Sequence, residues 1–363
     1  MTTATPTGGN PASTATPIPV SVDELTAEYL TRLLRTAGHD VIVETVSARP
    51  VGSGQMASSY RLTLGYRSDD TPLPDTLVAK LATGPIDQRL FVVGAYRNEI
   101  RFYREIADTV DAPTPTAYAS EISDEGTEFV LLLEDMTPAE QGDQILGAGP
   151  EVIKAVAVGA AGLHAPRWCD DTLASEHGLG LPTQEDADAM QEFLAPMADA
   201  FRERFDLGER EAAALDYLVA NARDWLIAPR PHFSIIHSDL RVDNVLFAPD
   251  GEVTIVDWQT ISAGSPLRDI SFLLSTSLDI EDRRLHERDI VAAYHAELLR
   301  RGVSDYSFQQ CWDDYVDGLL HTMLIVVFGA GAAKPTERGD TMFMTMLSRG
   351  AVAIDDLIPG ALS

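Results

Sequence analysis

The amino-acid sequence predicts an α+β protein with two lobes: an N-terminal lobe with an antiparallel sheet and a helix, and a larger, mostly helical C-terminal lobe. A chain of 363 residues is too long for one small core and fits two lobes around a cleft. Strand-like segments dominate the first third of the chain, and helical periodicity dominates the remainder. The two parts meet at residues 131–136, where an apolar run ends in Glu134 and Asp135.

We therefore expect a disordered tail over residues 1–21, an N-terminal lobe over 22–134 and a C-terminal lobe over 135–363. The tail is rich in Thr, Pro, Ala, Gly and Ser and lacks the basic start and apolar core of a secretory signal. The apolar run 319–333 is shorter than the ~20 residues that a membrane span needs, which predicts a buried helix.

The formal net charge of −29 argues against nucleic acid or an anionic membrane as a partner, because both would repel the protein. A solubilising surface is the simplest reason for this charge, and a cationic substrate is the alternative. The two cysteines, Cys169 and Cys311, show no metal-ligand spacing and predict a reduced, cytoplasmic protein without a structural disulfide.

The N-terminal lobe begins with a predicted helix, with Ser21 as N-cap, Glu24 completing a capping box and Gly38 near its end. Alternating apolar and polar residues then predict strands at 41–48 and 60–66, separated by a glycine-containing turn.

A third strand is predicted at 77–81, a helix at 90–107 and a further strand at 129–133. The helical pattern of the C-terminal lobe is interrupted by a hairpin at 245–256, where Pro249-Asp250-Gly251 turns the chain.

The residues that indicate chemistry lie in a short loop, 237–244, and at Asp257. Asp239 is predicted to accept the proton of an acceptor hydroxyl, while Asn244 and Asp257 supply the hard oxygen ligands that Mg²⁺ prefers. His237 is expected to brace the loop. One Asp or Asn alone would indicate loop capping, but the three at this spacing indicate phosphoryl transfer.

Two further charged residues, one within this loop and one after it, complete the prediction. Arg241 can reach a transferred phosphoryl group, with a surface cation as its alternative role, and Asp269 is expected to anchor the loop from the start of the next helix. His164, on a helix, is predicted to be structural.

Lysine is scarce in this chain, which has only Lys80, Lys154 and Lys334. Lys80 lies in the strand segment Leu77-Val78-Ala79-Lys80-Leu81, which resembles the Val-Ala-x-Lys pattern, whose lysine pairs with the α- and β-phosphates of ATP. Its predicted partner is Glu99 in the following helix, with Glu105 as the second choice. The alternative is an exposed strand lysine.

Two backbone segments are predicted to hold the rest of the nucleotide. Gly52 and Gly54 allow backbone amides to approach phosphate oxygens, and Ser58 adds a hydroxyl donor. Backbone groups around Glu134 and Met136 are expected to bind adenine, although a strand end with acidic caps explains this segment almost as well. Residues 22–134 would then be the nucleotide-binding lobe and 135–363 the catalytic and substrate-binding lobe.

Over about residues 45–330, these motifs together resemble the aminoglycoside phosphotransferase and choline-kinase-like family of small-molecule kinases. The segments 162–165, 257–259 and 264–266 carry the resemblance further, and the last two look most like the ecdysteroid-kinase-like branch and its bacterial relatives. The resemblance implies a protein-kinase-like fold and phosphorylation of a small-molecule hydroxyl with ATP and Mg²⁺ as cofactors.

The chain departs from the protein-kinase pattern in ways that bear on the acceptor. Ser238 replaces a frequent glycine, and Trp258-Gln259 replaces Phe-Gly. Only eleven residues separate Asp257 from Asp269, which leaves no room for an activation segment that docks a peptide. A peptide acceptor is therefore not expected. Among small molecules, the acceptor stays open between an antibiotic, a sterol-like alcohol, an amino alcohol and a hydroxyacyl-CoA. The alternative function is a nucleotide-binding pseudokinase that regulates a partner protein.

Overall fold

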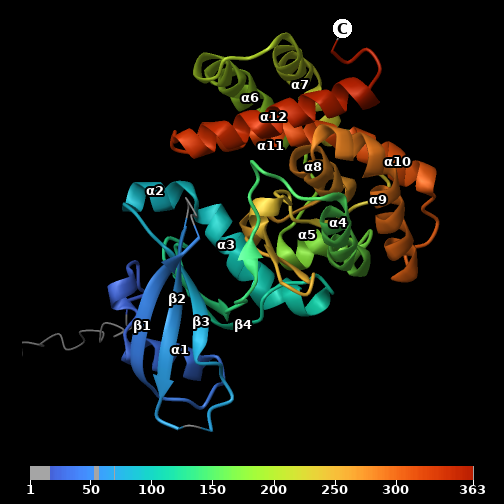
Figure 1. Ribbon diagram of the computed structural model, residues 1–363. Coiled ribbons are helices and arrows are strands. Elements are labelled where there is room, and N and C mark those ends of the chain that lie inside the picture. The colour runs from blue at the N-terminus through green and yellow to red at the C-terminus, as the bar shows by residue number, and fades with distance from the viewer. Residues whose placement is uncertain (1–16, 53–56, 69, 363) are drawn as a thin grey trace, which may run out of the picture.

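The computed structural model describes residues 17–52, 57–68 and 70–362. It has two lobes, as predicted: a twisted antiparallel sheet forms the smaller one, and helices form most of the larger one (Figure 1). The five strands have the spatial order β1-β2-β3-β5-β4. Their bounds are β1 Val43–Val51, β2 Ala57–Tyr66, β3 Thr76–Ala82, β4 Ala117–Ile122 and β5 Phe129–Glu134.

The pleat of β3 assigns its side chains to two environments. Leu77, Ala79 and Leu81 are fully buried in the core that the sheet shares with α1 (Ala27–Thr36). Lys80 lies between them in sequence and therefore points to the opposite face. That face is the one that the C-terminal lobe approaches, so the alternation of the strand sets the position of the lysine.

The first helix starts later than predicted. Ser21 and Glu24 do interact, since the Glu24 carboxylate accepts a hydrogen bond of 3.1 Å from the Ser21 N–H, but they flank a short 3-10 turn, η1 (Val22–Glu24). Leu25 leaves the helical region at ψ 62° and buries its side chain, and Thr26 caps α1.

The predicted helix at 90–107 is divided in the structure. It consists of α2 (Ile86–Phe91), α3 (Val93–Arg101), a π-helical turn η2 (Phe102–Ile106) and a 3-10 turn η3 (Ala107–Thr109). The strand β4 was missed, because its sequence is short and has little apolar alternation.

The C-terminal lobe contains the predicted hairpin, with Gly251 in the turn at φ 91°. The hairpin strands β8 (Val245–Phe247) and β9 (Val253–Ile255) are joined by β6 (Glu140–Gln141), and β7 (Ser234–Ile236) pairs with β10 (Ser262–Gly264). The helices are α4 Pro150–His164, α5 Thr172–His177, α6 Gln184–Arg204, α7 Glu209–Ile227, α8 Leu267–Ser277, α9 Ile280–Arg300, α10 Phe308–Asp317, α11 Leu319–Ala332 and α12 Glu337–Leu357. Short 3-10 turns lie at η4 Ala165–Arg167, η5 Val242–Asn244 and η6 Trp258–Thr260.

Within the described residues, Phe308–Ala332 is the one helical stretch that is long and apolar enough to cross a membrane, and core helices of soluble proteins pass the same test. Gly318 divides this stretch into α10 and α11. α11 packs against α6, α7, α8 and α12 with buried residues on both sides, which fits the prediction of a buried helix.

Candidate active site

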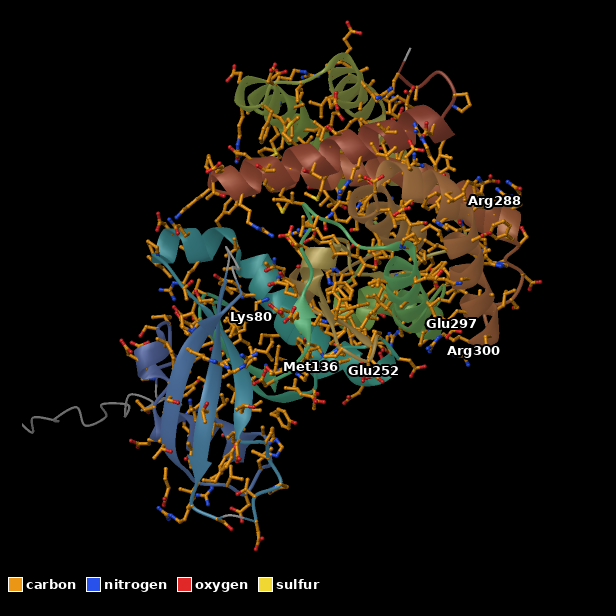
Figure 2. All side chains as sticks on the ribbon, in the orientation of Figure 1. Lys80, Met136, Glu252, Arg288, Glu297 and Arg300 are labelled. Carbon is orange, nitrogen blue, oxygen red and sulfur yellow. The ribbon has the colours of Figure 1, made fainter. Side chains whose placement is uncertain are left out.

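A cavity of about 290 Å³ lies between the two lobes. Figure 2 shows Lys80 and Met136 at this boundary, on β3 and just after β5. Its lining includes Gly52, Ser59, Lys80 and Glu99 from the N-terminal lobe, Glu134 and Met136 from the segment that joins the lobes, and Asn244, Asp257 and Gln259 from the C-terminal lobe. We call residues 134–136 the hinge. The cavity thus brings together residues that are up to about 200 positions apart in the sequence.

Lys80 forms ion pairs with two carboxylates. Its Nζ lies 2.6 Å from Oε2 of Glu99 and 2.8 Å from Oδ1 of Asp257. Burial by itself lowers the pKa of Lys80, but the two carboxylates outweigh burial and raise it, so the ammonium stays charged. Burial raises the pKa of Glu99, which is 2% exposed. The predicted second choice, Glu105, instead contacts His177.

Helix α3 and Phe102, which follows it, contact the turn after Asp257. The rings of Phe102 and Trp258 stack at 3.7 Å between centroids with an interplanar angle of 5°, and both are fully buried. Nδ2 of Asn98 donates hydrogen bonds of 3.3 Å to the carbonyls of Gln259 and Ile261. These contacts hold Glu99 near Lys80, and sequence analysis missed them because they join separate segments.

Asp269 anchors the loop 237–244, here called the catalytic loop. Its carboxylate accepts hydrogen bonds from the N–H of His237 at 2.7 Å and of Ser238 at 2.8 Å. His164 contacts the same carboxylate at 3.1 Å, and this contact explains why a buried histidine occurs in α4. Ser238 has φ 67°, in the left-handed region, which glycine adopts more readily than serine.

Histidines on both sides brace this loop. Nδ1 of His237 accepts a hydrogen bond of 3.3 Å from the Asp239 N–H, and Nε2 donates to the Val256 carbonyl at 3.0 Å. From α11, His321 contacts the Ser238 carbonyl at 2.9 Å. Sequence analysis assigned no role to His321, since no pattern near it points to the loop.

Asp239 lies in a small network within the catalytic loop, next to Asn244 of the cavity lining. One carboxylate oxygen accepts from Nε of Arg241 at 3.1 Å and the other from Nδ2 of Asn244 at 2.8 Å. Arg241 also contacts Asp243 at 2.7 Å. Burial alone would lower the pKa of Arg241, but the two aspartates raise it. Arg241 therefore orients the Asp239 carboxylate in addition to its predicted contact with a phosphoryl group.

Asn244 and Asp257 fit a magnesium ion by the chemistry of their donors. Both hydrogen bonds of the Asn244 amide use Nδ2, which leaves Oδ1 for a cation. Burial raises the pKa of Asp257, but Lys80 outweighs it and the net shift is downward, which favours a carboxylate. The described residues contain no cluster of three or more His, Cys, Asp or Glu that could hold a metal alone. An amide, a carboxylate and phosphate oxygens would form the set instead.

The glycine-containing turn is only partly described. Gly52 lines the cavity with φ 72°, while Gly54 lies outside the described residues. Ser58 does not take the predicted position: its hydroxyl lies 3.2 Å from that of Thr83, and Ser59 lines the cavity instead. Adjacent strand residues point to opposite faces, so a one-residue error in the prediction exchanges the two sides.

The fold has two lobes, and a lysine, two carboxylates and the catalytic loop face one cavity between them. These features define a protein with a kinase-like fold. The ecdysteroid kinase-like family matches residues 52–302, and the chain belongs to this family. No curated protein sequence matches the chain.

Solved structures of small-molecule kinases share the fold. A macrolide 2'-phosphotransferase type I is 15% identical with a TM-score of 0.51, covering 91% of this chain and 99% of that one. An ethanolamine kinase from Plasmodium vivax is 11% identical with a TM-score of 0.51, covering 85% and 82%. A streptomycin–ATP ternary complex of an aminoglycoside phosphotransferase is 13% identical with a TM-score of 0.50, covering 90% and 96%.

Proposed function

We propose that this protein is a cytoplasmic phosphotransferase that uses ATP and Mg²⁺ to phosphorylate a hydroxyl group of a small molecule. The observation that carries the proposal is the arrangement of Lys80 and Asp257, from opposite lobes, at one cavity with Asn244, whose amide in turn contacts Asp239. The family match and the ATP-bound relative support the choice of nucleotide.

Each residue of the candidate site has its own role in the proposed phosphoryl transfer. Lys80 donates to the α- and β-phosphates, and the hinge around Glu134 and Met136 binds adenine through backbone groups. Asn244 and Asp257 would hold Mg²⁺, and the bound ion would supply positive charge against the developing charge on the phosphates. Asp239 orients the acceptor hydroxyl and accepts its proton, a role that the hydrogen bonds from Arg241 and Asn244 support.

The short connection between Asp257 and Asp269 supports a small acceptor. It contains only a 3-10 turn, η6, and the strand β10, which pairs with β7 beneath the catalytic loop. η6 is occupied by contacts with α3 and Phe102 of the other lobe, and β10 by its pairing with β7, which leaves no free segment between Asp257 and Asp269 to present a peptide. The titles of the structural neighbours name macrolide, aminoglycoside and ethanolamine enzymes, and these supply the first acceptors to test.

The test is a ³¹P NMR assay of the purified protein with ATP, Mg²⁺ and a panel of neutral, cationic and anionic alcohols. A new phosphate-ester signal with matching ADP release supports the proposal and identifies the acceptor class. ATP binding without transfer to any acceptor, and without ADP release, would favour the pseudokinase alternative.

A further inference from the structure

We infer that Gln144 is a positioning residue that sets the place of the catalytic loop and, through it, of the magnesium ligand Asn244. This inference rests on the proposed function. Gln144 lies beyond the hinge, between β6 and α4, and is fully buried. No motif in the sequence marks it, and it contributes no atom to the lining of the interlobe cavity.

The polar groups of Gln144 are divided between the catalytic loop and α8. The side-chain Oε1 of Gln144 accepts a hydrogen bond of 3.1 Å from the Val242 N–H. The backbone N–H of Gln144 donates to Oδ1 of Asp243 at 2.8 Å. Its Nε2 donates to the Thr276 carbonyl of α8 at 2.9 Å. The side-chain amide of Gln144 is thereby fixed between the catalytic loop and α8. Asp243, the loop residue next to Asn244, is held against the core of the lobe.

The residues before Gln144 pack on the same part of the loop. Nε2 of Gln141 donates to the Asp243 carbonyl at 2.6 Å, and the N–H of Gly142 donates to the Val245 carbonyl at 3.1 Å. A Cβ at Gly142 would lie 2.3 Å from the Val242 carbonyl oxygen, so only glycine allows this approach. The segment 140–144 thus packs along the loop, and its residue Gln141 also lines the interlobe cavity.

The contacts of Gln144 with the catalytic loop also affect the proposed magnesium site at Asn244. Val242 and Asp243 connect Arg241 to Asn244, so any shift of their backbone moves both side chains that contact Asp239. Without Gln144, the buried Val242 N–H loses the acceptor that it has in the structure, and the loop must move to find another. Partners that orient metal ligands typically change metal affinity or activity by about 10–100-fold when removed.

The test measures nucleotide binding as a function of Mg²⁺ concentration, with a fluorescent ATP analogue as the probe and thermal unfolding in parallel. Gln144→Met keeps the volume of the side chain and removes its hydrogen bonds to Val242 and Thr276. Gln144→Glu, in contrast, keeps an acceptor for the Val242 N–H. The control is Gln191→Met in α6, whose amide contacts the Val219 carbonyl at 3.1 Å within the helical part of the lobe.

We expect Gln144→Met to require about 10–100-fold more Mg²⁺ for the same nucleotide binding, Gln144→Glu to lie between it and the wild type, and Gln191→Met to match the wild type. A Mg²⁺ dependence of folded Gln144→Met equal to that of the wild type overturns the inference. If Gln144→Met does not fold, Gln141→Ala decides, because it removes a part-buried contact to the Asp243 carbonyl of the same loop. Its nucleotide affinity without Mg²⁺ serves as the reference, because Gln141 also lines the cavity, and an unchanged Mg²⁺ dependence there also overturns the inference. Wild-type protein that binds no nucleotide with Mg²⁺ contradicts the proposed function instead.

Discussion

The ammonium of Lys80 lies 2.8 Å from a carboxylate oxygen of Asp257, which is 177 positions later in the chain. This contact joins strand β3 of one lobe to the end of the hairpin in the other. It places the only lysine of the cavity lining between a helix carboxylate, Glu99, and a predicted metal ligand. The pair therefore aligns the two lobes as well as taking part in the proposed reaction.

The first prediction concerns Lys80. Lys80→Met removes the cation that the carboxylates of Glu99 and Asp257 share, so phosphoryl transfer is expected to fall by at least about 100-fold. The measurement is ADP release at saturating acceptor, with Lys334→Met as the control, because Lys334 is exposed and distant in sequence. A near-normal rate for Lys80→Met would move the phosphate-binding role to an arginine.

Asp239 is the predicted general base. Asp239→Ala removes the proton acceptor and is expected to lower kcat by about 10²–10⁴-fold while nucleotide affinity stays within a few-fold of wild type. Single-turnover kinetics and nucleotide titration separate these effects. Asp250→Ala, in the exposed hairpin turn, is the matched control. Equal losses of turnover and nucleotide binding would assign Asp239 to binding instead.

The stack between Phe102 and Trp258 is predicted to contribute to stability. Trp258→Ala empties a fully buried site, which typically costs about 3–5 kcal/mol of unfolding free energy. Chemical denaturation checks this value, and Trp312→Ala, at a half-buried position, should cost less. Comparable losses for the two variants would show that the stack adds nothing beyond ordinary burial.

His321 predicts a pH dependence of stability. Burial, reinforced by Arg268, lowers the pKa of His321 to about 4 from its usual 6.5. The unfolded chain thus binds a proton that the folded protein excludes, and stability is lost as the pH falls from 6.5 to about 4. The loss from this group is up to about 3 kcal/mol.

Urea denaturation at pH 7.5 and pH 4.5 measures this loss. His321→Gln can keep the hydrogen bond to the Ser238 carbonyl without titrating, so its stability should change less between the two pH values. If the wild type and His321→Gln lose the same free energy, the acid sensitivity comes from other groups.

Much of the candidate site was predictable because its parts lie in short segments with strong local constraints. The loop from His237 to Asn244 and the strand around Lys80 each carry their pattern within a few residues, and the pairing of Lys80 with Glu99 follows from strand and helix geometry. The roles assigned to these residues stay predictions until they are tested, as does the boundary between the lobes at residue 134.

The errors arose where local pattern is ambiguous. Ser58 was chosen in place of Ser59 because a strand pattern without a clear register does not distinguish its two faces. The helix start moved from Ser21 to Thr26 because burial of Leu25 overrides the capping box. The predicted helix at 90–107 is interrupted at Val92 and becomes a π-helical turn at Phe102, whose ring stacks on Trp258. No local signal reports that contact.

The sequence by itself determined the fold class, the residue types around Lys80 and in the catalytic loop, and the short path from Asp257 to Asp269, since each depends on residue types at fixed spacing. Only the tertiary structure decided which residues support that chemistry. Gln144, His321 and Asn98 each contact a backbone group far away in the chain. Backbone carbonyls and amides occur at nearly every position, so a side chain that binds them leaves no distinctive pattern in the sequence.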